Sequence, residues 1–382
     1  MSAPPPLSPG RVWAHVGQPF APSPYDVAVV GAGRMGAAAA LFLRQRAPAL
    51  RVLLVEEGGL PNEEGATILA PGVWSRLGLD PALHPAADWT RAALQALGDV
   101  GWESRPLVTL HAGAAPGRVP TLEALAPWPD SLALVDPAAL PWAELDRDAA
   151  TYRPGHAALH AAQAAIRAGA DLLLNTRAAP QPGGRLCLER LTVTNTHQIV
   201  THETLTVPAR AVVLAAGAGG PGWPNARWAC TPATPAPTAR PRTSRCPARR
   251  RARSCARGLT LRPQHGAYTL IPPLHGRDPH GYQPAGGQLT GVPTGLRRET
   301  LEDLVALMDA LPVLATDALH LGRSLADVPG AWLALPGGRP EGLPTFEVLD
   351  EHTWLLLGGP QADTLGLHAA QGLAEAVAAA LA

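Results

Sequence analysis

The chain has 382 residues, of which 46% are hydrophobic and 16% charged, and its formal net charge is zero. This length and composition allow about two soluble domains, and the balanced charge gives no reason to expect a nucleic-acid partner. All 31 basic residues are Arg, which excludes catalysis by a lysine, whether as a Schiff base or in a phosphate-binding loop.

The N-terminal residues are rich in Pro and lack the apolar core of a secretory signal, which predicts a disordered tail over residues 1–21. No stretch comes near the ~18 apolar residues of a membrane span, and the four Cys do not make a disulfide framework. No cysteine pair has the spacing of a zinc site, so we expect no metal. These features predict a cytoplasmic protein and leave its oligomeric state open.

Buried strands and a helix follow this tail. Residues 25–33 (YDVAVVGAG) form a short apolar run that ends in Gly, 34–47 hold strong helix formers, and 51–57 (RVLLVEE) are typical of a second strand. Parallel strands need a crossover of this kind, which is almost always right-handed. The pattern predicts a β–α–β unit at the start of an α/β domain.

The turn inside this unit has the sequence GAGRMG. Gly31 permits a tight turn, Gly33 lets the backbone approach a pyrophosphate, and Gly36 lets helix and strand pack closely. A helix N-terminus adds free N–H groups and about +0.5 of partial charge, which suit a diphosphate. Glu56, at the end of the next strand, suits ribose hydroxyls. The motif predicts a dinucleotide site; the alternative is a glycine-rich turn without a ligand.

Later segments predict further elements, whereas residues 58–150 show few clean periods. We expect a helix over 156–170, a strand over 171–178, antiparallel strands over 185–195 and 203–209, and a strand over 210–220. Beyond these we expect strands over 266–273 and 286–294, an amphipathic helix over 299–312, a hairpin over 346–359 and a C-terminal helix over 364–382.

Residues 229–257 interrupt this pattern with eight Arg, five Pro and three Cys, but no acidic residue and no Leu, Ile, Val, Phe or Met. A structureless insert of this length is uncommon inside a compact domain. Without aliphatic side chains, the segment is not expected to supply a core strand. Two interpretations stay open: a frameshift-like translation product of GC-rich DNA, or a genuine disordered insert.

Four segments follow one another along the chain: DVAVVGAGRMGAAAALFLRQRAPALRVLLVEE, NEEGATILAPGVW, YRPGHAALHAAQAAIRAGADLLLNTRA and RAVVLAAGAGG. Together they resemble the FAD-dependent oxidoreductases of the D-amino-acid oxidase family, a group that includes glycine oxidase, sarcosine oxidase and D-amino-acid dehydrogenase. The resemblance covers most of residues 25–225 and, more weakly, 265–382. It implies an α/β fold: a Rossmann-like FAD-binding domain (22–75, 151–226 and 345–382) with an inserted antiparallel-sheet substrate domain (76–150 and 227–344).

The resemblance also implies a set of cofactor positions. At the pyrophosphate and ribose these are Gly31, Gly33, Arg34, Met35, Gly36 and Glu56, with Arg34 either touching phosphate or solvated. Near the flavin they are Ala66, Thr67, Gly217, Gly358 and Gly359, and at the adenine the backbone of Arg177 or Ala178. Pro360 removes one N–H donor from the last of these loops.

The substrate side departs from the family. Amine-oxidising members usually carry Gly-Leu-Arg-Pro before an Asp-Gly-Leu-Pro turn, and the Arg binds the substrate carboxylate. Here the turn is Glu341-Gly342-Leu343-Pro344, and Pro336 stands where the Arg is expected. Other substrate-side candidates, each of which has a structural role as its alternative, are Tyr268, Tyr282, Arg277, Arg339 and His265.

The resemblance therefore predicts an enzyme that uses FAD to oxidise a C–N bond of an amino acid or amine by hydride transfer to flavin N5. Three alternatives remain. The protein acts on a non-carboxylate amine or a modified base, it is a FAD-binding protein impaired by the 229–257 segment, or it is a nicotinamide-dependent dehydrogenase. The substrate, the electron acceptor and the attachment of FAD are left open.

Overall fold

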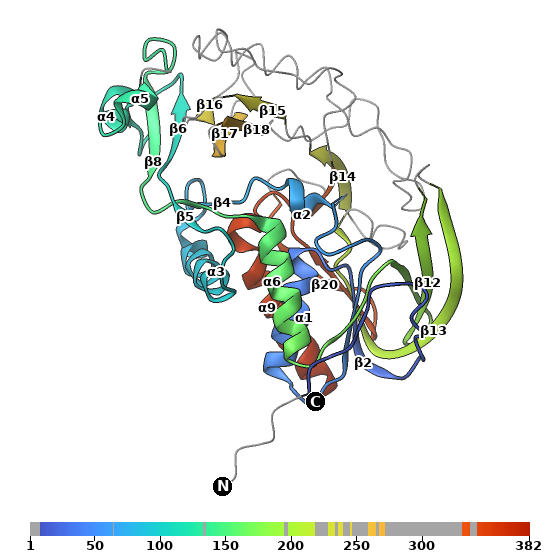
Figure 1. Cartoon of the computed structure of the whole chain (residues 1–382). Coiled ribbons are helices and arrows are strands. Elements are labelled where there is room, and N and C mark those ends of the chain that lie inside the picture. Colours follow the sequence, from blue (N-terminus) through green and yellow to red (C-terminus); the bar gives the residue numbers. More distant parts are fainter. Residues whose placement is uncertain are drawn as a thin grey trace.

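The computed structural model describes residues 8–63, 65–132, 135–194, 198–217, 228–233, 236–239, 245–246, 259–264, 267–271, 331–336 and 342–382. At its centre is a nine-stranded sheet with helices packed on one face (Figure 1). The parallel strands of this sheet follow the order β1–β10–β3–β2–β13–β21. Their bounds are β1 (Val12–Trp13), β2 (Tyr25–Val30), β3 (Val52–Val55), β10 (Asp171–Leu173), β13 (Ile199–Leu214) and β21 (Thr353–Leu357).

Helices connect these strands in the expected way. Helix α1 (Arg34–Arg46) crosses from β2 to β3, which confirms the predicted β–α–β unit. Helix α6 (Pro154–Arg167) leads into β10, and α9 (Ala362–Leu381) follows β21 and ends the chain. Strand β20 (Thr345–Val348) runs antiparallel to β21, which confirms the predicted hairpin.

Strand β13 belongs to two layers because it is 16 residues long. Its C-terminal half pairs in parallel with β2 and β21, whereas its N-terminal half pairs antiparallel with β12 (Arg185–Val193). Strand β12 in turn pairs with β11 (Thr176–Gln181). The prediction of separate strands over 203–209 and 210–220 is wrong, since Pro208 sits within the ladder without ending the strand.

The parallel sheet is buried on both faces, which explains why its strands are continuous apolar runs. Along β2, Val27 and Val29 pack with the helix layer, whereas Ala28 and Val30 pack with the β12–β13 layer behind the sheet. Helix α1 packs against both α6 and α9. It buries a run of Ala from Ala37 to Ala40, and such small side chains let the three helices approach closely.

A second, seven-stranded sheet has the order β15–β18–β17–β16–β6–β8–β7. Its strands are β6 (Leu107–His111), β7 (Val119–Pro120), β8 (Trp142–Asp146), β15 (Ala236–Ala239), β16 (Arg245–Cys246), β17 (Leu259–Gln264) and β18 (Ala267–Ile271). Both stretches of chain that form it fall within the ranges predicted for the substrate domain, whose boundaries remain a prediction.

Smaller elements complete the fold. Strands β4 (Val73–Trp74), β9 (Ala150–Thr151) and β5 (Glu103–Ser104) form one sheet, and β14 (Trp228–Ala233) pairs with β19 (Ala331–Pro336). The remaining helices are α2 (Ala66–Leu69), a 3-10 turn (Pro81–Leu83), α3 (His84–Ala96), α4 (Thr121–Leu125) and α5 (Pro129–Leu132). Within the described ranges, no helix is long and apolar enough to cross a membrane.

The prediction of a disordered tail over residues 1–21 is wrong from residue 8 onward. Strand β1 extends the sheet beside β10, and Phe20 is buried. Arg190, which is fully buried in β12, donates to the carbonyls of His15 and Gln18 at 2.5 Å each. These partners lie 175 and 172 positions away in the sequence, so the Pro-rich composition of the segment does not reveal them.

Two other expectations also need correction. The predicted strand over 171–178 breaks at Leu174 and Asn175, and Asn175 has φ of 51°, a left-handed conformation that Asn tolerates. The expectation of a structureless insert over 229–257 is wrong at its described residues, whose backbone forms parts of β14, β15 and β16. Pairing of backbone N–H and C=O groups does not require aliphatic side chains. The expected strand over 286–294 and helix over 299–312 lie outside the described residues.

Candidate cofactor site

Two positions, one in the turn between β2 and α1 and one in the first turn of α1, admit only Gly. Gly31 has φ of 100°, and a Cβ there would lie 2.7 Å from the carbonyl oxygen of Ala215. A Cβ at Gly36 would lie 1.9 Å from the carbonyl oxygen of Gly31. The turn therefore packs tightly against the end of β13, at the carboxyl edge of the sheet where open α/β sheets bind ligands.

Gly33 is the N-cap of α1, so the cap residue has no side chain over this helix end. A Cβ at Gly33 would lie 3.0 Å from Oγ1 of Thr67. Thr67 stands beside Ala66 in α2 and accepts a hydrogen bond from the Arg34 backbone N–H at 3.2 Å. The other N–H groups of the first turn have no partner within the helix, and with the partial positive charge there they suit a phosphate.

Glu56 follows β3, and its side chain turns back to the glycine turn. The residue is 6% exposed, and its carboxylate accepts from the backbone N–H groups of Ala32 (2.6 Å) and Gly58 (3.2 Å) and from the amide of Asn62 (2.8 Å). A carboxylate has about four lone-pair sites, so a ribose hydroxyl still finds an acceptor. The role of Asn62 was not predicted, since the loop sequence does not show which side chain turns back.

A second helix N-terminus lies at the same edge of the sheet. Strand β21 leads through Gly358 and Gly359 into α9, and Gly359 has φ of 63°. A Cβ at Gly358 would lie 3.5 Å from Cγ of Met35, and one at Gly366 would lie 2.6 Å from its Sδ. The start of α1 and the start of α9 thus pack together through Met35 and small residues.

Two further predicted positions, Gly217 and Ala178, lie in different parts of the fold. Gly217 follows β13 at the edge that Gly31 occupies, with φ of 55°. Ala178 lies on β11 and packs with the apolar layer behind the sheet. The first residue of β11, Thr176, contacts the site, because its backbone N–H donates to the carbonyl of Glu56 at 2.9 Å.

The substrate-side candidates are described only in part. Tyr268 lies on β18, whose backbone pairs with β15 and β17. Tyr282, Arg277, Arg339 and His265 lie outside the described residues. In the described part of the chain, no three His, Cys, Asp or Glu side chains gather as metal ligands.

Pro336, the last residue of β19, lies against the glycine turn before α9. A Cβ at Gly359 would stand 2.6 Å from Cδ of Pro336. Since Pro336 occupies the position of the expected carboxylate-binding Arg, the structure brings that position next to the predicted flavin loop.

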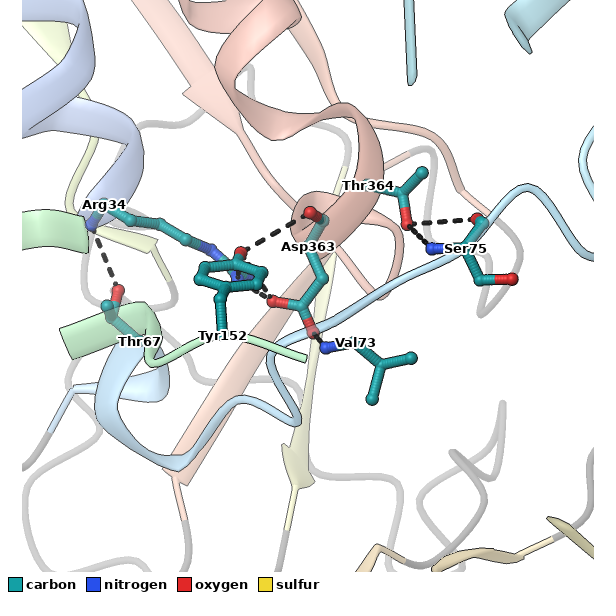
Figure 2. A network of polar contacts seen from close by, with 7 residues as sticks. All are labelled: Arg34, Thr67, Val73, Ser75, Tyr152, Asp363 and Thr364. Atoms are coloured by element: carbon teal, nitrogen blue, oxygen red, sulfur yellow. Dashed lines mark hydrogen bonds and ion pairs between the residues drawn. The ribbon is translucent and has the colours of Figure 1, made fainter. Parts of the chain in front are cut away.

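Figure 2 shows the side chain of Arg34 turned toward Tyr152 and Asp363. Its Nη1 donates to Oδ1 of Asp363 and, at 3.0 Å, to the hydroxyl of Tyr152. With 7% of the residue exposed, the guanidinium is bound within the protein rather than solvated. Neither Asp363 nor Tyr152 was predicted, because Asp363 lies 329 positions from Arg34 and no local pattern links them.

The sequence from residue 26 to residue 380 matches the family model described as FAD dependent oxidoreductase. The chain belongs to the FAD-dependent oxidoreductase family. Comparison with curated proteins gives no match. The family's cofactor is FAD, and the residues described above fit it: a tight glycine turn, two helix N-termini and a buried carboxylate meet at one edge of the sheet.

Solved structures share this fold at low sequence identity. L-amino acid deaminase from Proteus myxofaciens, in complex with anthranilate, has a TM-score of 0.65 at 14% identity, over 97% of this chain and 94% of that chain. L-proline dehydrogenase from P. horikoshii has a TM-score of 0.63 at 16% identity, over 94% and 93%. Glycine oxidase from Bacillus cereus has a TM-score of 0.61 at 15% identity, over 92% and 94%. The likeness confirms the predicted α/β class with a Rossmann-like FAD domain.

Proposed function

We propose that this FAD-dependent oxidoreductase oxidises a C–N bond of an amino acid or amine. Its main support is the meeting of the α1 and α9 N-termini at one sheet edge, in a fold shared by proteins named for glycine, L-amino acid and L-proline substrates. FAD, when bound, supplies the hydride acceptor at its N5. The chain itself has to bind, orient and shield the reactants, and this chemistry requires no side-chain base.

Each part of the site then has one task. The first turn of α1 binds the diphosphate through backbone N–H groups, and Glu56 accepts a ribose hydroxyl. Ala66 and Thr67 lie along the flavin, and the Gly358–Gly359 turn directs backbone N–H groups at its pyrimidine edge. Behind the sheet, the backbone of Ala178 meets the adenine, and Gly217 returns the chain to the cofactor.

Anaerobic mixing of the holoprotein with candidate substrates tests the proposal. Glycine, D-amino acids, L-amino acids and simple amines are added separately, and the loss of oxidised-flavin absorption is followed. We expect at least one of these classes to reduce the bound FAD with a rate that saturates with concentration. If none does so while dithionite reduces the same FAD, oxidation of these amino acids and amines is wrong, and what is left is either action on a modified base or an impaired FAD-binding protein.

A second candidate function is oxidation of an amine without a carboxylate, or of a modified base. The position of Pro336 against Gly359 favours it, because proline offers neither a charge nor an N–H donor to a carboxylate. Matched pairs separate the two candidates: methylamine against glycine, and benzylamine against phenylglycine. Faster reduction by the carboxylate-free member supports the second candidate, and the reverse supports the first.

A further inference from the structure

A buried ion pair joins the first turns of α1 and α9 (Figure 2). Arg34 is the first residue of α1 and Asp363 the second residue of α9, and their side chains are 8% and 5% exposed. The Asp363 carboxylate also accepts from the hydroxyl of Tyr152 at 3.1 Å and from the backbone N–H of Val73 at 3.3 Å. Segments far apart in the sequence therefore meet at this one carboxylate.

The two charges act oppositely on the helix ends that carry them. A helix N-terminus has about +0.5 of partial charge, so a carboxylate is favourable there and a cation is not. Asp363 thus stabilises α9 but offsets the positive potential at the start of that helix. Arg34 gains nothing from α1 and is held by Asp363 instead. Within the described residues, Arg34 is the cation that forms an ion pair with Asp363.

This helix end belongs to the cofactor site. Gly358 and Gly359 lead directly into α9, and Asp363 follows them within about one helical turn. Two-electron reduction adds negative charge to the flavin ring. A positive potential from the α9 N-terminus therefore binds reduced FAD more strongly than oxidised FAD, and an uncompensated carboxylate would weaken that preference.

We propose that Arg34 is a positioning residue that holds Asp363 and cancels its charge, so that the α9 N-terminus keeps a positive potential toward reduced FAD. The proposal rests on the placement of the Gly358–Gly359 turn at the flavin, which is part of the proposed function. It does not depend on the identity of the substrate.

The midpoint potential of bound FAD, measured by dye-coupled reduction of the holoprotein without substrate, tests this role. In Arg34→Met the carboxylate is uncompensated. We expect affinity for reduced relative to oxidised FAD to fall about tenfold, which lowers the potential by about 30 mV. In Asp363→Asn the guanidinium is uncompensated, and a rise of about the same size is expected. The neutral double variant returns close to the wild-type potential.

Tyr152→Phe is the matched control, since it removes a hydrogen bond to the same carboxylate but no charge. The affinity of Tyr152→Phe for reduced relative to oxidised FAD should stay within about twofold of the wild-type value. If the network were purely structural, the midpoint potential of bound FAD would shift in the same direction in all variants, because each variant loosens the same contact. The proposal would be overturned if the midpoint potential shifted with the same sign in Arg34→Met and Asp363→Asn, or if it shifted in neither.

If Arg34→Met does not fold because a buried carboxylate has lost its partner, Asp363→Asn and the neutral double variant decide. The proposal then requires a raised potential in Asp363→Asn and a near-wild-type potential in the double variant, and any other pair of results overturns it. Since no substrate is present in these titrations, failure of the proposed amine oxidation appears only in the flavin-bleaching experiment.

Discussion

Replacing Gly33 by Ala separates cofactor binding from folding. Gly33 has φ of −59° and ψ of 173°, which Ala adopts without strain. The new methyl group would lie 3.0 Å from Oγ1 of Thr67, a contact that a small shift relieves. Ala at an N-cap costs about 1 kcal/mol relative to Gly, whereas the stiffer unfolded chain returns about 0.4–1 kcal/mol. The melting temperature should therefore stay within ~3 °C of wild type.

FAD binding should respond much more strongly. The methyl group stands where the first turn of α1 has to approach the diphosphate. Loss of one charge-assisted hydrogen bond costs about 1.5–3 kcal/mol, which raises the Kd for FAD by about 10- to 150-fold. Titration of the apoprotein with FAD, followed by quenching of FAD fluorescence, measures this change.

Substitutions of two other glycines by Ala serve as comparisons for Gly33→Ala. Gly113→Ala is the matched control, because it is the same change at an exposed position where a Cβ would meet nothing within 4 Å. Gly36→Ala is the opposite case, since its Cβ would lie 1.9 Å from the carbonyl oxygen of Gly31, and we expect little folded protein. If folded Gly33→Ala binds FAD as tightly as Gly113→Ala does, the diphosphate does not lie at this turn.

Three further predictions concern one residue of the cofactor site and two residues that stabilise the fold. Glu56→Gln removes the charged acceptor of three hydrogen bonds and should raise the Kd for FAD at least about tenfold. The control variant Glu57→Gln, at a half-exposed carboxylate, should change the Kd by less than about fivefold. Equal effects of the two variants on the Kd would contradict the role of Glu56. Burial and a hydrogen bond to Asp171 raise the pKa of Tyr25, so its contribution to stability is present below pH ~10 and lost as the pH rises further. The fall in melting temperature above pH ~10 should accordingly be smaller in Tyr25→Phe, and an identical fall would refute this. Arg190→Met leaves two carbonyls of the N-terminal segment without their donor and should expose that segment to limited proteolysis; wild-type resistance would show that other contacts hold it.

The local parts of the fold could be predicted from the sequence. Apolar runs fix β2 and β3 as buried strands, and the Gly31 turn follows because its backbone angles and close contacts allow no side chain. Such features depend on neighbours in the sequence, so composition and spacing are sufficient. The C-terminal hairpin and helix were predictable for the same reason.

Long-range contacts could not be predicted in this way. Asp363 was not predicted as a partner of Arg34, because a first-turn acidic residue is ordinary on any helix and only the packing of α9 on α1 brings the two together. The N-terminal segment has the composition of a disordered tail, because the residue that holds it, Arg190, is far along the chain and donates to its Gln18 carbonyl. Helix α3 was also missed, since Pro and Gly around it obscure a buried face of only Ala87, Thr90 and Leu94.

FAD binding by the purified full-length chain tests the central claim most directly. The apoprotein is titrated with FAD, passed over a desalting column, and examined by absorption spectroscopy. We predict saturable binding of one FAD per chain and a flavin absorption band that stays with the protein. A folded protein that remains colourless and takes up no FAD would contradict the assignment of the α1 and α9 N-termini as the cofactor site.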